Sequence, residues 1–263
     1  MNAPAHLKRP SQLKDLALAL LLAAAGAAFA CYAYATRQSY IARAVRPSDG
    51  CLAYRPVPAT LVVIGDRTDR LTGSQPRRWL SAVDDALGHM PSGSKVYFTN
   101  IGPTAPVEIS FPPALCVPEP GDAKHAEDLR KQIRQDEQAL EAAAATRYSA
   151  IAETILVAAR DHAFRGVSTK TIIVASDFLE NTPSSSVYRR RGFALPPVAN
   201  LPFKNTVMHL VVLQNLRDER FQTRRLIDGK WIAWMRAGGA SRVEVDADWL
   251  GYGQVQLAKG ANP

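Results

Sequence analysis

The stretch Thr60-Leu61-Val62-Val63-Ile64-Gly65-Asp66-Arg67-Thr68-Asp69-Arg70-Leu71-Thr72 decides the fold. Its first five residues are largely apolar and do not alternate, which predicts a parallel strand covered on both faces. Ligands of open α/β sheets collect beyond the carboxyl ends of such strands. Asp66, Thr68 and Asp69 follow directly, so they are candidate oxygen ligands for a hard cation such as Mg²⁺. The alternative is that Asp66 and Thr68 only cap a turn between the strand and a helix.

Working outward, strand patterns alternate with helix patterns through the rest of the chain. Strands are expected at residues 95–101, 107–111, 169–175, 205–214 and 242–245, and helices at 74–90, 122–145, 149–162 and 222–237. Ser74 is the expected cap of the first of these helices, and 107–111 is expected to be an edge strand. This order predicts a three-layer, doubly wound (Rossmann-like) α/β domain with a mainly parallel sheet. His209 is interpreted as a core residue, and 182–204 as a loop.

An uncharged apolar segment precedes this domain. Residues 16–35 would span roughly 30 Å as a helix, which is the thickness of the hydrocarbon core of a bilayer. Ala28-Phe29-Ala30 resembles a cleavage site, and Cys31 after it allows a lipoprotein interpretation. Because the apolar run is longer than a signal core and continues past Cys31, an uncleaved transmembrane helix is favoured. The predicted organisation is a basic tail (1–15), this helix (16–35), a stalk (36–57), the α/β domain (58–250) and a tail (251–263).

Basic residues flank the span almost equally at both ends, so they do not predict its orientation in the membrane. The cysteines indicate on which side of the membrane the soluble domain lies. Cys51 and Cys116 are the only thiols outside the span. They are candidates for a disulfide in an oxidising compartment, the alternative being two unpaired structural thiols. We favour a soluble domain that lies outside the cytoplasmic membrane.

The composition restricts the partners. Hydrophobic residues make up 47% of the 263, enough for a real core, and the net charge of +8 is mild for a chain of this length. Such a charge fits an anionic membrane surface or an acidic partner as well as it fits nucleic acid. No nucleic-acid-binding module is legible, so nucleic acid is not an expected partner.

Three segments together resemble the von Willebrand factor type A domain. They are the strand followed by Asp66-x-Thr68-Asp69-x-Leu71-Thr72, the hydroxyl of Ser149 in Tyr148-Ser-Ala-Ile151, and the run Ile173-Val-Ala-Ser-Asp-Phe-Leu-Glu-Asn181. The resemblance covers roughly residues 58–247. It is closest to bacterial membrane-anchored, uncharacterised members, and it implies a single-pass protein of the bacterial inner membrane whose soluble domain is periplasmic.

The resemblance implies a metal-ion-dependent adhesion site that holds Mg²⁺ and accepts a carboxylate from a partner protein. The family pattern has an Asp-x-Ser/Thr-x-Ser loop, a second loop with Thr or Ser, and a third with Asp. Asp66 and Thr68 match the first loop, Ser149 (or the nearby Thr146) is similar to the second, and Asp177 to the third. Arg70 stands where the second hydroxyl of the first loop belongs. Asp69 or Thr72 could compensate, or Arg70 could supply the positive charge in place of the cation.

The expected function is a membrane-anchored protein-binding module, with a partner and an oligomeric state that the sequence does not name. A competing hypothesis is a metal-dependent phosphoester hydrolase that uses Asp66, Asp69 and Asp177, with Arg70 or Arg189 as a clamp. Against an enzyme, the sequence has no Gly-rich phosphate loop, no nucleophile elbow and no rim histidine. A third hypothesis is a metal-free structural component of an envelope assembly.

Overall fold

The chain divides into two compact units, Met1–Val45 and Arg46–Pro263. The computed structural model describes residues 10–45, 50–52, 56–68, 73–102, 114–144, 146–161, 164, 166–189 and 193–250. The expected strand at 107–111, the tail 251–263 and the candidate residues Asp69, Arg70 and Thr72 lie outside these ranges.

The first unit contains the helix α1 (Pro10–Ala44). Within it, the stretch Asp15–Ile41 is long and apolar enough to cross a membrane. Its large apolar side chains, including those of Leu20, Leu21 and Phe29, are exposed rather than packed in a protein core. An exposed apolar helix of this length is what a bilayer accommodates and water does not.

The second unit is built on a six-stranded sheet, with the order β3-β2-β1-β4-β5-β6 among the described residues. The central strand β1 (Ala59–Asp66) pairs in parallel with β2 (Lys95–Ile101) and with β4 (Thr169–Ser176). β5 (Thr206–Val212) and β6 (Arg242–Asp246) extend the sheet in parallel. The short edge strand β3 (Leu115–Cys116) is antiparallel. Every residue of β1 is buried, as the unbroken apolar run predicts.

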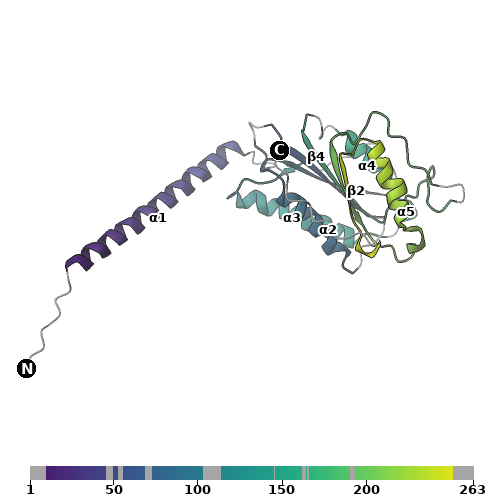
Figure 1. The fold of residues 1–263 in the computed structure, drawn as a ribbon. Helices are drawn as coiled ribbons and strands as arrows, with labels where there is room; N and C mark the ends of the chain where they lie inside the picture. Colours follow the sequence, from purple (N-terminus) through teal and green to yellow (C-terminus); the bar gives the residue numbers. More distant parts are fainter. Residues whose placement is uncertain are drawn as a thin grey trace, which may run out of the picture. The chain divides into compact units, whose positions relative to one another are not determined.

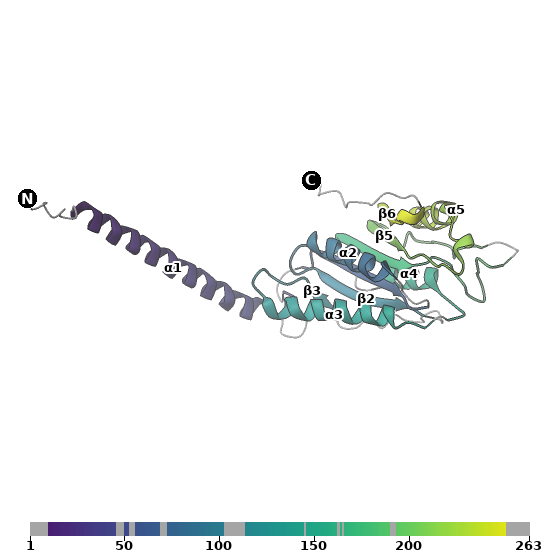
Figure 2. The same ribbon diagram turned by 90° about the horizontal axis from the view of Figure 1, so that it is seen from below.

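Helices cover both faces of the sheet, which confirms the three-layer α/β prediction (Figures 1 and 2). On one face, α2 (Gln75–Gly88) and α3 (Ala123–Glu141) pack through Trp79, Val83 and Leu140. On the other, α4 (Ile151–Arg160) packs beside a continuous C-terminal helix through Ile155 and Trp231. That C-terminal helix consists of α5 (Arg224–Leu226), the π-helical segment η3 (Ile227–Ile232) and α6 (Ala233–Ala237). His209 is buried in the middle of β5, as interpreted from the sequence.

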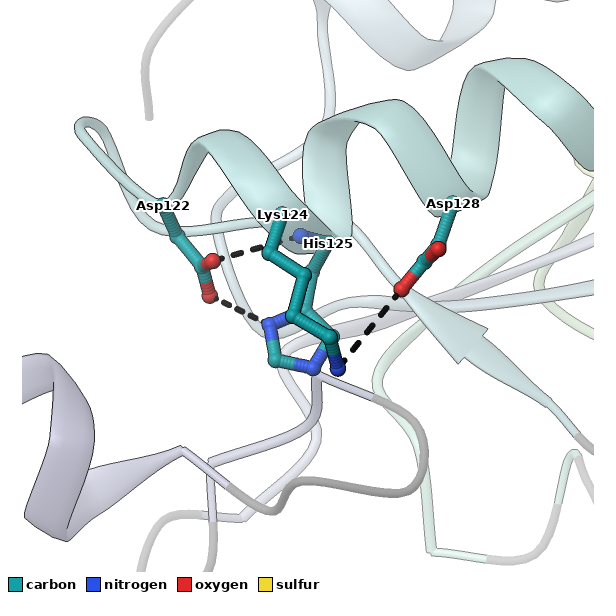
Figure 3. A network of polar contacts seen from close by, with 4 residues as sticks. All are labelled: Asp122, Lys124, His125 and Asp128. Atoms are coloured by element: carbon teal, nitrogen blue, oxygen red, sulfur yellow. Dashed lines mark hydrogen bonds and ion pairs between the residues drawn. The ribbon is translucent and has the colours of Figure 1, made fainter.

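The cap of α2 differs from the expectation. Ser74 precedes α2, but its side chain makes no capping hydrogen bond. The start of α3 is instead strongly capped: the Asp122 carboxylate accepts the backbone N–H of His125 and contacts Nδ1 of the same residue at 2.7 Å (Figure 3).

Gly50, at φ +71°, lies against the His125 ring, where a Cβ atom would come within 2.8 Å of Cγ. Next to it, Cys51 and Cys116 form a disulfide that fastens the end of the stalk to β3.

Candidate functional site

Asp66 ends β1 at the carboxyl edge of the sheet, and its side chain is 3% exposed. Its Oδ1 accepts two hydrogen bonds from Thr68, one from the backbone N–H at 2.9 Å and one from the hydroxyl at 2.5 Å. This is an Asx-type turn, in which a short acid folds the chain that leaves the strand. The turn interpretation of Asp66 and Thr68 is therefore part of the structure, whatever else the pair binds.

The second oxygen of Asp66 faces two other segments of the chain. Oδ2 accepts the hydroxyl of Ser176 at 2.6 Å and that of Ser149 at 3.4 Å. Ser176 ends β4, which pairs with β1 in a register that sets Gly65 beside Ala175. We call Asp66, Thr68, Ser149 and Ser176 the Asp66 cluster. One buried carboxylate and three hydroxyls, from three places in the sequence, meet there.

Ser149 is held in the cluster by backbone pairing with the loop that follows β4. Its N–H donates to the Asn181 carbonyl at 2.9 Å, and the Asn181 N–H donates back at 3.0 Å. Thr146, the alternative candidate in this loop, uses its hydroxyl locally on the Tyr148 carbonyl at 2.8 Å. The Thr146 N–H donates to the Thr68 carbonyl at 2.8 Å, so both residues lie near the cluster, but it is the Ser149 hydroxyl that reaches Asp66.

Asp177 is engaged with a different part of the rim. Its Oδ1 accepts the backbone N–H of Leu179 at 2.8 Å, and its Oδ2 accepts the side-chain amide of Asn215 at 2.8 Å. Gln222 donates to the Asp177 carbonyl at 2.8 Å. The structure therefore ties Asp177 to the loop after β5, whereas the neighbouring Ser176 takes the position against Asp66.

The residues of the Asp66 cluster are chemically suited to a hard cation. A hydroxyl that donates its proton to a carboxylate keeps lone pairs for another partner, and Mg²⁺ prefers oxygen ligands and retains several waters. Thr68, Ser149 and Ser176 would supply hydroxyl ligands, with Asp66 supplying the charge. Among the described residues, no group of three histidine, cysteine or acidic side chains is placed to hold a metal, so a cation here would depend on hydroxyls.

Sequence reasoning missed Glu180, a second buried acid close to this site. Its side chain is 2% exposed, and its Oε2 accepts the backbone N–H of Ala152 in the first turn of α4 at 2.9 Å. Burial raises the pKa of Glu180 to about 7, opposed by the N–H groups of α4 and assisted by the negative charges of Glu153 and Asp66. A glutamate three residues beyond Asp177 in a loop carries no sequence signal of burial.

The residue that follows Asp66 in the chain, Arg67, is positively charged. The guanidinium of Arg67 lies 3.1 Å from Oδ1 of Asp136 on α3, and the Asp136 side chain is 3% exposed. The pKa of Asp136 is raised overall, because burial raises it by more than the charge and the hydrogen bond of Arg67 lower it. The ion pair directs the Arg67 charge toward α3, and it ties the end of β1 to that helix.

The backbone beside the cluster is in an uncommon conformation. Phe178 is fully buried and has a φ of +57°, a region that non-glycine residues rarely occupy. Its N–H donates to the Ser176 hydroxyl at 3.0 Å, and its carbonyl accepts the indole N–H of Trp231 at 3.0 Å. The two rings meet edge to face at 5.3 Å. These contacts hold the turn that lets Ser176 face Asp66 while Asp177 faces Asn215.

Comparisons with known proteins give little beyond this geometry. No family model and no curated protein matches the chain. Among solved structures, the chain is similar to the crystal structure of an aerotolerance-related membrane protein from Bacteroides fragilis with multiple mutations to serines. That likeness has a TM-score of 0.40 at 12% identity, and it covers 73% of this chain and 94% of the other.

Proposed function

We propose that the chain is a membrane-anchored protein-binding module of the von Willebrand factor A type, which uses an adhesion-like Mg²⁺ site at the carboxyl edge of its sheet. The observation that carries the proposal is the Asp66 cluster: a buried carboxylate receives hydroxyls from Thr68 and Ser149, the residues that the family pattern assigns to its first and second loops. Bound Mg²⁺ would offer an open position to a carboxylate of the partner protein.

The remaining residues of the family pattern have different support. Asp177 occupies the position of the third loop, but its carboxylate bonds to Leu179 and Asn215. Ser176 contacts Asp66 directly and is the better-placed neighbour for a cation. Asp69 stays a sequence prediction, because it lies outside the described residues.

The proposed location is a bacterial inner membrane with the soluble unit on its periplasmic side. α1 contains a stretch suited to span a bilayer, which supports a single-pass anchor. The Cys51–Cys116 disulfide supports an oxidising compartment for the second unit, since cytosolic thiols are kept reduced.

A metal-free structural role is the second candidate, and one observation favours it. Oxygens of the Asp66 carboxylate accept four hydrogen bonds from protein groups, so the charge is stabilised without a cation. In that case the cluster would only join the ends of β1 and β4 to the loop before α4.

Thermal unfolding of the full chain in detergent micelles, with MgCl₂ and then with excess chelator, separates the two candidates. A ligand that binds only the native state must stabilise it, by about 2.7 kcal/mol at a hundredfold excess over Kd. We expect Mg²⁺ to raise the melting temperature of the wild type and of the control Asp84→Asn, whose carboxylate is exposed on α2. Asp66→Asn should lose the response.

Since Asp66→Asn could unfold the domain, Ser149→Ala is a second variant that removes only one hydroxyl. It should fold and respond to Mg²⁺ more weakly than the wild type. If the wild type melts at the same temperature with Mg²⁺ and with chelator, the proposal of a metal site is wrong and the structural role is supported.

A further inference from the structure

A second surface of the rim is formed by the loops that follow β4 and β5. We call it the rim platform, and it consists of Tyr188, Arg189, Leu216, Arg217, Arg220 and Phe221. The Tyr188 and Phe221 rings meet edge to face at 5.0 Å and join the two loops. The Tyr188 hydroxyl also donates to Oδ2 of Asp218 at 3.1 Å.

The platform is held by buried groups beneath it. The side-chain oxygen of Asn215 accepts the backbone N–H of Arg217 at 3.1 Å and that of Asp218 at 3.2 Å, which forms the turn that carries Arg217. Its side-chain nitrogen donates to Asp177. Gln222, 3% exposed, accepts the backbone N–H of Asn215 at 2.6 Å. A surface held in this way loses little conformational entropy on binding.

The platform carries three arginines, of which Arg189 donates to the Pro183 carbonyl at 2.6 Å. Arg189, Arg217 and Arg220 are exposed, and within the ranges that the structure describes their guanidinium groups form no ion pair. Two acids lie in the same loop and offset part of this charge: Asp218 accepts from the Tyr188 hydroxyl, and Glu219 accepts from Gln214 at 3.2 Å. The three arginines still outnumber the two acids.

The exposed face of α3 is a contrast on the same domain. There, Lys124 lies 3.9 Å from Asp128, and Glu127 lies 2.5 Å from Arg134 (Figure 3 shows the first pair). Charges that are paired with acids on the same helix offer less to a partner than do the platform arginines, which form no ion pair within the described residues.

The platform also presents apolar surface among these charges. Leu216 is 72% exposed and Tyr188 is 40% exposed. Arginine and aromatic residues around an exposed apolar side chain are the composition typical of protein interfaces. A single-stranded nucleic acid would need free ring faces for its bases, yet Phe221 has the Arg220 guanidinium over its ring at 4.8 Å.

We infer that the rim platform binds an acidic segment of a partner protein. Carboxylates of the partner would pair with Arg217 and Arg220, and an apolar side chain of the partner would pack against Leu216. The inference rests on the proposed function in one respect, since it names the chemistry of the partner at the same rim. Guanidinium and carboxylate groups match in a planar, two-bond geometry, and the pairing needs no metal ion.

The test measures peptide binding to the full chain in zwitterionic nanodiscs, with chelator present throughout. The probe is a fluorescent peptide that alternates glutamate with leucine, compared with its glutamine counterpart. We expect the glutamate peptide to bind in a salt-sensitive way and the glutamine peptide to bind at least about tenfold more weakly. Arg217→Ala/Arg220→Ala should weaken binding to the same degree. The matched control, Arg130→Ala/Lys131→Ala on α3, removes the same charge and should bind as the wild type does.

Several results would overturn the inference: equal binding by the two double variants, equal binding of the two peptides, or no binding of the glutamate peptide. Capture of phosphatidylglycerol vesicles or of an oligonucleotide without capture of the peptide would also overturn it, because the surface would then recognise phosphates. Since chelator is present, failure here is distinct from failure of the Mg²⁺ site, which the melting experiment tests alone.

Discussion

Asp177 holds Asn215 across thirty-eight residues of sequence, with the Asn215 amide nitrogen 2.8 Å from Oδ2 of the acid. The same asparagine organises the turn that carries Arg217. An acid that the family pattern assigns to a metal site therefore supports the neighbouring rim platform in this structure. Ser176, the preceding residue and the last of β4, donates to Asp66 instead.

Asn215→Ala should loosen the rim platform without affecting the Asp66 cluster. The substitution leaves the Asp177 oxygen and two backbone N–H groups without this partner, which costs about 1–3 kcal/mol. Urea unfolding would measure that loss, and hydrogen exchange should show faster exchange at residues 215–221. Gln135→Ala on the exposed face of α3 is the control and should change neither quantity. Unchanged exchange in the loop would contradict the role given to Asn215.

Glu180 should make the domain less stable as the pH rises through neutrality. Its folded pKa of about 7 lies above the ordinary value of 4.5, so the folded state binds the proton more tightly than the unfolded state does. The contribution of Glu180 to the free energy of unfolding is fully present below its ordinary pKa and is lost as the pH rises through about 7. The difference corresponds to about 3 kcal/mol at most.

Glu180→Gln keeps an oxygen for the Ala152 N–H and cannot ionise. Urea unfolding between about pH 5 and pH 8, with chelator present, should give a flatter profile for this variant than for the wild type. Other buried acids, including Asp136, add slopes of the same sign, so the comparison between the two proteins is the informative quantity. Glu127→Gln, an exposed control, should follow the wild type. Parallel profiles for wild type and Glu180→Gln would show that burial does not raise the pKa of Glu180.

Gly65 is required by the packing of α3 on β1. A Cβ atom there would lie 2.7 Å from Cδ2 of Leu140, which is fully buried and has little room to move. Gly65→Ala should therefore destabilise the domain by about 1–3 kcal/mol. In the double variant Gly65→Ala/Leu140→Ala the clash is absent, so its total loss should be smaller than the sum of the single losses. Strict additivity in chemical denaturation would argue against this contact.

Reduction of the Cys51–Cys116 disulfide should destabilise the second unit. The bridge closes a separation of 65 residues, for which the chain-entropy model gives about 4 kcal/mol. Guanidinium unfolding with and without dithiothreitol measures the change, and Cys51→Ser/Cys116→Ser should be insensitive to the reductant. Cys31→Ser, which removes the exposed free thiol of α1, is the control and should respond to reduction as the wild type does.

The sequence by itself determined the elements and the layers of this domain. The apolar run at residues 60–64 is long enough for a strand buried on both faces, and the helical spacing of Trp79, Val83 and Ala86 gives α2 its buried stripe. Such patterns are local, so one sequence carries them. The same locality marked Asp66, Thr68 and Asp177 as residues that follow buried strands, whereas Ser149 was expected only from the family resemblance.

Only the tertiary structure decided which of these side chains meet. The register of β4 against β1 brings Ser176 to Asp66, and the turn at Phe178, just past the end of β4, directs Asp177 toward Asn215. Neither register nor the burial of Glu180 leaves a signal in the residue types nearby. Contacts across dozens of residues are set by how the layers pack, because packing brings together positions that have no local relation in the chain.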